Sequence, residues 1–166
     1  MNEIWAGIQE AFRLIIILDS DLIEITVRSL KVSLTALVVA SALALPFGTW
    51  LAIRRFRYRR VTIAALNALM GLPPVVVGLI VYLLLSRSGP FGVLGLLFTP
   101  TAMIVAQVII ITPLIASITH QAMRELWSEY HDLLISLNTS KRQRVAALIW
   151  DGRRTLMTAA LAGFGR

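Results

Sequence analysis

The stretch that decides the fold is WSEYHDLLISLNTSKRQRVAALIWDGRR, residues 127–154, a long charged segment between strongly apolar runs. Apolar or aromatic residues recur along its first half at the spacing of one helical face: Leu126, Tyr130, Leu133, Leu134 and Leu137. This spacing predicts an amphipathic helix that ends at Asn138, because asparagine tolerates the left-handed backbone that closes a helix. Ser140 and Gln143 have capping-box spacing, which predicts a second short helix that stops at Gly152. We therefore expect two short helices joined by a bend.

The spacing of this segment resembles the cytoplasmic signature loop of ABC importer permeases, which is written E-A-A, three residues, G, nine residues, I-x-L-P. In this alignment Asp132-Leu133-Leu134 stands for E-A-A, Asn138 for the glycine, Leu148 for the isoleucine and Trp150-Asp151 for L-P. No position is identical, but the acid, the turn former and the apolar site are each replaced by a physically similar residue. The alternative is a solvated amphipathic loop of some other membrane protein.

Composition places the chain among membrane proteins. Hydrophobic residues make up 57% of the chain and charged residues only 15%, and uncharged runs exceed the roughly 20 residues that cross a bilayer. The absence of cysteine excludes a disulfide framework, a thiolate metal site and a thiol nucleophile. The net charge of +7 does not indicate nucleic acid, because most basic residues flank apolar spans. We expect an all-α, polytopic helical membrane protein.

Residues 1–31 are expected to form an N-terminal segment apart from the transmembrane domain, which we assign to residues 32–166. The most apolar part, Ile15 to Leu18, is too short to span, and Ala11 to Leu18 is predicted to form a helix that lies at the membrane surface or packs on the bundle. Its acidic leader and the lack of a small-residue cleavage site argue against a signal peptide. The acidic stretch that follows is predicted to lie outside the cytoplasm.

The first predicted span, Val32–Ile53, ends at residues 54–60, which contain five arginines in seven positions. This cluster marks the cytoplasmic side, although such a cluster also suits anionic lipid or nucleic acid. Pro46 and Gly48 are expected to bend the lower third of the span. Because the loop at residues 123–154 is also basic, the N-terminus is predicted to lie outside and that loop inside.

Two further spans are predicted, Val61–Leu85 returning outward and Thr101–Ala122 descending again. The turn-rich connection at residues 86–100 carries only Arg87 and is expected to be external. The apolar run that begins at Thr155 is too short to cross before the chain ends, so we expect the fourth span to be incomplete.

The second span is interrupted by MGLPPVVVG, residues 70–78. Two adjacent prolines remove two backbone donors within the membrane, so the freed carbonyls must face protein or a water-filled path. A kink that only serves packing is the alternative. Amides in spans bond to a neighbouring helix more often than to a substrate. The residues considered for a translocation path are Asn67, Pro73, Pro74, Gly78 and Gln107.

Residues 70–107 resemble those of tungstate-specific permeases, relatives of the molybdate and methionine importers, and AGFGR at residues 162–166 resembles the start of their post-loop helix. The resemblance extends from about Leu30 to Arg166. It implies a homodimer of five-span subunits in a prokaryotic inner membrane, each bearing a nucleotide-binding ATPase. A solute-binding protein would deliver an oxyanion from outside.

The sequence contains no glycine-rich phosphate cradle with lysine, no carboxylate pair at useful spacing and no Ser/His/Asp set. We therefore expect a non-catalytic subunit that has no cofactor or metal of its own and whose partner binds ATP. The amphipathic helix pair would seat its ridge in a groove of the ATPase. The residues expected to couple the two proteins are Tyr130, Asp132, Leu133, Leu134, Leu137, Asn138 and Thr139.

The alternatives to an ATP-driven tungstate importer are another solute or another class of membrane protein. The carried solute could instead be molybdate, sulfate or methionine. A secondary transporter or an intramembrane enzyme would normally show ionisable residues inside its spans, and the predicted spans have none before His120. A membrane sensor would need a soluble signalling domain, which a loop of this length does not supply.

Overall fold

The computed structural model describes residues 4, 5, 7, 20–54 and 56–164. The longer described segments form α2 (Ser20–Ile53), α3 (Arg59–Met70), α4 (Pro74–Leu85), the short 3-10 helix η1 (Gly92–Leu94), α5 (Pro100–Ser136), α6 (Lys141–Asp151) and α7 (Arg153–Phe164). No strand is found in the part of the chain that the structure describes. The prediction of an all-α architecture is confirmed. The helix predicted at Ala11–Leu18 lies outside the described residues.

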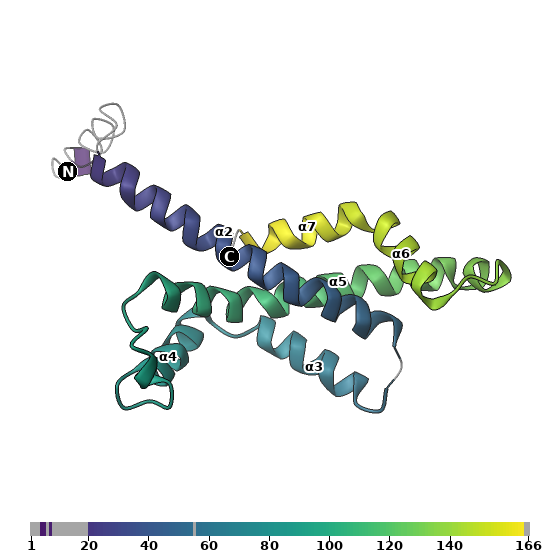
Figure 1. The fold of residues 1–166 in the computed structure, drawn as a ribbon, viewed down its shortest axis with the longest axis horizontal. Coiled ribbons are helices and arrows are strands. Elements are labelled where there is room, and N and C mark those ends of the chain that lie inside the picture. Colours follow the sequence, from purple (N-terminus) through teal and green to yellow (C-terminus); the bar gives the residue numbers. More distant parts are fainter. Residues whose placement is uncertain (1–3, 6, 8–19, 55, 165–166) are drawn as a thin grey trace.

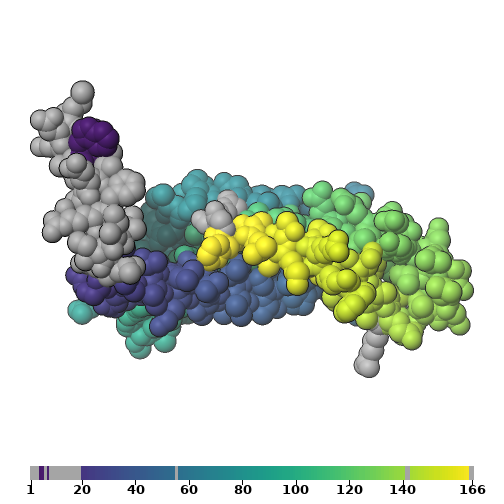
Figure 2. Space-filling model, turned by 90° about the horizontal axis from the view of Figure 1, so that it is seen from above, coloured from purple at the N-terminus to yellow at the C-terminus, as the bar shows by residue number. Residues whose placement is uncertain are grey.

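The bundle is built around α2 and α5, which lie side by side and run in the same direction (Figure 1). α3 packs on α5, and α7 lies along both long helices, as the space-filling view also shows (Figure 2). The connection between α2 and α3 and the bend after α5 lie at one end of the bundle, which we call the basic end (Figure 1). The connection between α4 and α5 lies at the opposite end.

Among the helices that the structure describes, two are long and apolar enough to cross a membrane, α2 and α5, and the pair α3 and α4 is bent by 99° at a short break. Each helix of the pair has 12 residues, which gives about 18 Å of helix against a hydrocarbon core of about 30 Å. Neither can therefore cross alone. The predicted interruption is confirmed, with Pro73 as the residue before α4 and Pro74 as its first residue.

The helix α2 begins at Ser20 and not at Val32, where the span was predicted to start. Residues 20–31 are exposed along their whole length, and Val32 is the first buried residue of α2. An ion pair between Glu24 and Arg28, one helical turn apart, supports this exposed extension. Residues 20–31 thus extend the helix of the predicted span toward the N-terminus. Packing against the bundle begins only at Val32, where the uncharged run begins. α2 also continues through Pro46 as a single helix.

Small residues let α2 and α5 approach closely. From residue 36 to residue 52 of α2, every fourth residue is small and buried: Ala36, Ala40, Ala44, Gly48 and Ala52. A Cβ atom added at Gly48 would lie 2.6 Å from the carbonyl oxygen of Ala116 and 2.8 Å from Cβ of Thr119. Helices in membranes associate through such close backbone contacts, since lipid provides no hydrophobic drive. This seam therefore fixes how the two long helices pack.

α5 is a single helix of 37 residues, so the first of the two predicted short helices is not separate from the last complete span. No proline or glycine interrupts residues 114–136, and buried Ala122 and Met123 carry the apolar stripe across the expected boundary. The charged residues that suggested a boundary lie on the exposed side of the same helix. The predicted loop at residues 123–154 thus consists of the end of α5, a tight bend and α6.

Candidate functional site

The bend after α5 has the predicted geometry. Asn138 adopts a left-handed backbone with φ of 50°, and the hydroxyl of Thr139 donates to the carbonyl of Leu134 at 2.6 Å. The Ser140 amide then donates to Oε1 of Gln143 at 2.8 Å, and the Gln143 amide donates to Oγ of Ser140 at 3.4 Å. The predicted turn and capping box are both confirmed.

Arg144 fixes this bend, although the sequence suggested only that it adds positive charge. Its Nε donates to the backbone carbonyl of Thr139 at 3.0 Å and lies 3.2 Å from the Thr139 hydroxyl oxygen. The first turn of α6 is therefore tied to the end of α5 by a charged donor. Thr139 and Arg144 are five residues apart across a turn, a spacing that matches neither helical nor strand periodicity. The sequence pattern therefore did not indicate this contact.

The loop folds back on the bundle through an apolar cluster. Its buried members are Ala52, Met123, Leu134, Leu148 and Leu156. Gly152 lies so close to α5 that an added Cβ would contact Met123 Cε and lie 2.8 Å from Cδ1 of Leu126. The helices α5, α6 and α7 thus meet in one packed junction at the basic end.

Leu134 was predicted to be one of three leucines that face a partner, and the structure corrects this. Leu134 is only 9% exposed and belongs to the buried cluster, whereas Leu133 and Leu137 are 53% and 63% exposed. The apolar stripe of α5 is wider than the surface that this chain covers. Its inner edge packs against the rest of the chain, and its outer edge is exposed. We call Leu133 and Leu137 the outer leucines.

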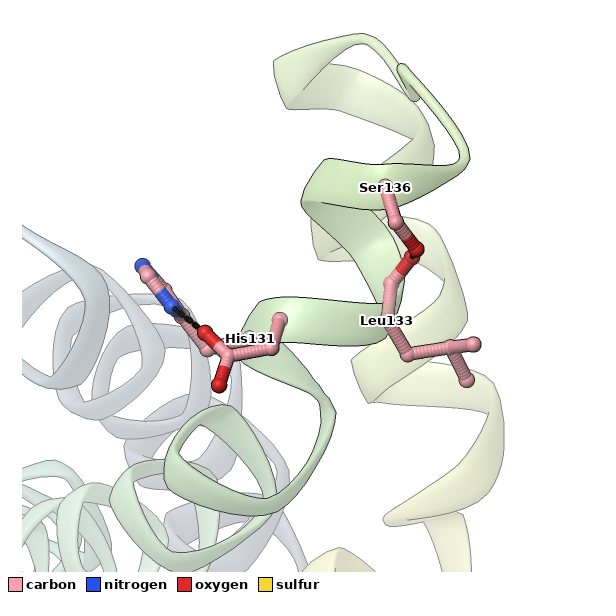
Figure 3. A network of polar contacts seen from close by, with 4 residues as sticks. His131, Leu133 and Ser136 are labelled. Atoms are coloured by element: carbon pink, nitrogen blue, oxygen red, sulfur yellow. Dashed lines mark hydrogen bonds and ion pairs between the residues drawn. The ribbon is translucent and has the colours of Figure 1, made fainter.

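Two polar residues of the predicted coupling set, Tyr130 and Asp132, lie in different surroundings. Tyr130 packs against the buried cluster, and the Asp151 carboxylate, by its charge and by a hydrogen bond, raises the pKa of the Tyr130 hydroxyl. Asp132 is exposed, and its carboxylate lies 2.9 Å from Nδ1 of His131. Figure 3 shows His131 on the opposite side of α5 from Leu133.

The residues considered for a translocation path lie in separate places. Ser117 on α5 donates to the side-chain oxygen of Asn67 on α3 at 3.0 Å, as expected for a helix-to-helix contact. Gly78 lines a cavity of about 370 Å³ between α4 and α5. Gln107 lines a smaller cavity of about 40 Å³, and its buried Oε1 has no hydrogen-bond partner. The path remains a prediction.

Arg59 joins three helices at the basic end. It is the first residue of α3, and its guanidinium donates to the carbonyls of Leu51 and Ala52 at 3.0 and 3.4 Å, which caps the end of α2. The same group lies 3.4 Å from Nε2 of His120 on α5. Within the described residues, no group of three or more histidine, aspartate or glutamate side chains could hold a metal ion.

These features define a multi-pass helical membrane protein with a folded helical loop at one end. Residues 44–165 match the family described as binding-protein-dependent transport system inner membrane component. The chain belongs to this family, whose members are membrane subunits of transporters that depend on a separate binding protein.

Curated relatives agree with this family. The tungstate uptake system permease protein TupB of Peptoclostridium acidaminophilum is 34% identical over all 166 residues, which span 73% of that protein. A probable anion ABC transporter permease protein of Haloferax volcanii is 37% identical over 145 residues, 87% of this chain and 62% of that protein. TupB of Campylobacter jejuni is 28% identical over the whole chain, which spans 70% of that protein.

Proposed function

We propose that this chain is the membrane-spanning permease subunit of an ATP-driven importer for an oxyanion, with tungstate as the preferred solute. The observation that carries the proposal is the 34% identity to a tungstate uptake permease, which runs through all 166 residues and so includes both the bent helix pair and the loop. The similarity to an anion permease from a different organism supports the broader oxyanion class.

In this proposal the chain does not hydrolyse ATP and has no cofactor of its own. The outer leucines seat in a groove of a separate ATPase, where two exposed apolar side chains on a helix supply the anchors that such docking requires. Because Leu133 lies on α5, which is one helix from Pro100 to Ser136, and Leu137 is the C-cap residue of that helix, a shift of the ATPase moves the membrane-spanning part of α5 directly. No flexible joint separates the docking residues from that part.

The proposed orientation places the basic end in the cytoplasm and the start of α2 outside. The described residues between the end of α2 and the first turn of α3 include Arg54, Arg57, Arg59 and Arg60, and this connection lies at the same end as α6, as the positive-inside rule requires. An extracytoplasmic solute-binding protein then meets the opposite end. The exposed apolar side chains of α2 and α4 fit a homodimer in a prokaryotic inner membrane, surrounded by membrane lipid.

Uptake by the assembled transporter tests the proposed solute. Proteoliposomes that hold this permease, its ATPase and the binding protein are expected to accumulate tungstate only when ATP is present. Molybdate is expected to compete better than sulfate, and methionine not to compete, since it is no oxyanion. Accumulation that is driven by an ion gradient without ATP would indicate a secondary transporter and contradict the proposal. Preference for methionine would contradict the oxyanion class.

A further inference from the structure

A polar pocket of about 330 Å³ lies at the basic end, where the end of α2, the start of α3 and α5 meet. Its polar lining comes from two arginines, a serine, a histidine and an aspartate, with an indole as part of the wall: Arg59, Arg124, Ser128, His131, Asp132 and Trp127. The pocket is distinct from the outer leucines, because its α5 residues include His131, which lies on the opposite side of that helix from Leu133 (Figure 3).

The spacing of the α5 residues explains why their side chains converge. Arg124, Ser128 and His131 lie at offsets of four and seven, so they share one face of the helix. Each offers an N–H or O–H donor. Trp127 holds the His131 ring in an edge-on contact with ring centroids 5.0 Å apart. One helix face thus presents three donors to the cavity.

Arg59 supplies a second fixed cation from the other side of the pocket. Its Nε and one terminal nitrogen are bound to the last carbonyls of α2, which holds the guanidinium in place. Among the described residues, no carboxylate forms an ion pair with Arg59 or Arg124. The one acidic group in the lining, Asp132, contacts His131 instead. Two permanent positive charges without a carboxylate partner therefore border the same cavity.

We infer that this pocket binds a small, doubly charged tetrahedral oxyanion at the basic end of the bundle. Guanidinium, imidazole and hydroxyl donors match the acceptor oxygens of such an anion, and the two permanent cations of the lining outnumber its one carboxylate, Asp132. The identification of the ligand with the transported solute rests on the proposed function, whereas the anion chemistry rests on the lining residues. In the proposed orientation the pocket lies at the cytoplasmic end of the bundle.

Titration of the purified full chain in detergent with sodium tungstate tests this inference, with ionic strength held constant by chloride. Isothermal calorimetry gives the affinity, and a change in tryptophan fluorescence that is lost in Trp127→Phe places the site near Trp127, since the chain has four tryptophans. Tungstate is expected to bind saturably, and Arg124→Gln is expected to weaken binding about tenfold or more, because a hydrogen bond to a charged group is lost. Arg60→Gln is the matched control: it removes the same charge from an exposed residue outside the pocket and is expected to leave the affinity unchanged.

Several results would overturn the inference. Equal weakening in Arg124→Gln and Arg60→Gln would indicate a diffuse field of positive charge and not a site. Absence of saturable binding would also refute it. Sulfate and phosphate are titrated in parallel, and saturable binding of phosphate without tungstate would identify free phosphate as the ligand and refute the link to transport. No ATPase is present in this titration. Failure to bind tungstate would therefore refute the pocket without refuting the proposed ATP-driven uptake.

Discussion

Replacing Gly48 with leucine is expected to separate α2 from α5 and to remove most of the folded protein from the membrane. A Cβ at this position already meets the Ala116 carbonyl oxygen at 2.6 Å, and that oxygen belongs to helix backbone, which cannot rotate away. Overpacking of a close interface costs about 1–3 kcal/mol when side chains can adjust, and the cost should exceed this range here. The measurement is the yield of monodisperse protein in a mild detergent, together with its thermal unfolding.

The matched control for this substitution is Gly78→Leu. A Cβ added at Gly78 has no heavy atom within 4 Å, so leucine there is expected to fold with the yield of the parent. The interpretation of the α2 and α5 seam would be wrong if Gly48→Leu were recovered and melted like Gly78→Leu.

The second large effect is expected for Leu134→Glu, which places a carboxylate in the cluster formed by Met123, Leu134 and Leu148. An ionised carboxylate without a partner is costly to bury, by several kcal/mol, so the loop should detach from the bundle. Limited trypsin digestion is expected to cut rapidly within residues 138–154, which contain several basic residues. The membrane-embedded parts of α2 and α5 should remain protected.

Leu137→Glu controls for the new charge, because Leu137 lies three residues away on the same apolar stripe but is 63% exposed. It is expected to leave the digestion pattern unchanged. Equal cleavage of both variants would show that Leu134 does not hold the loop in place.

Features set by local backbone chemistry could be predicted from the sequence. Asn138 ends α5 in the left-handed region, Ser140 and Gln143 form the capping box, and adjacent prolines break the second span. Each depends on residues within a few positions of one another, so spacing alone was informative. The start of the uncharged run at Val32 could also be read from the sequence, and it coincides with the first buried residue of α2.

Features set by tertiary packing could not be predicted in this way. Amphipathic spacing shows which side of α5 is apolar, but it does not tell whether that side meets this chain or a partner, so Leu134 was misplaced. The start of α2 carries apolar residues at helical spacing, Ile23, Val27 and Leu30, but its charged residues led to its assignment to the external segment, so the extension of α2 was missed. Arg59 and Arg144 act through backbone carbonyls that only the folded chain brings within reach.

Copurification of the ATPase with a permease that carries both Leu133→Glu and Leu137→Glu is the most direct test of whether the outer leucines dock this ATPase. Two carboxylates buried without partners in a small docking surface cost more than the surface contributes, while both positions are exposed in this chain, so folding should be retained. We predict that the double variant loses the ATPase and binding-protein-stimulated ATP hydrolysis, and that Arg57→Ser retains both. Retention of the ATPase by the double variant, with its loss in Arg57→Ser, would contradict the account and place the contact in residues 54–60.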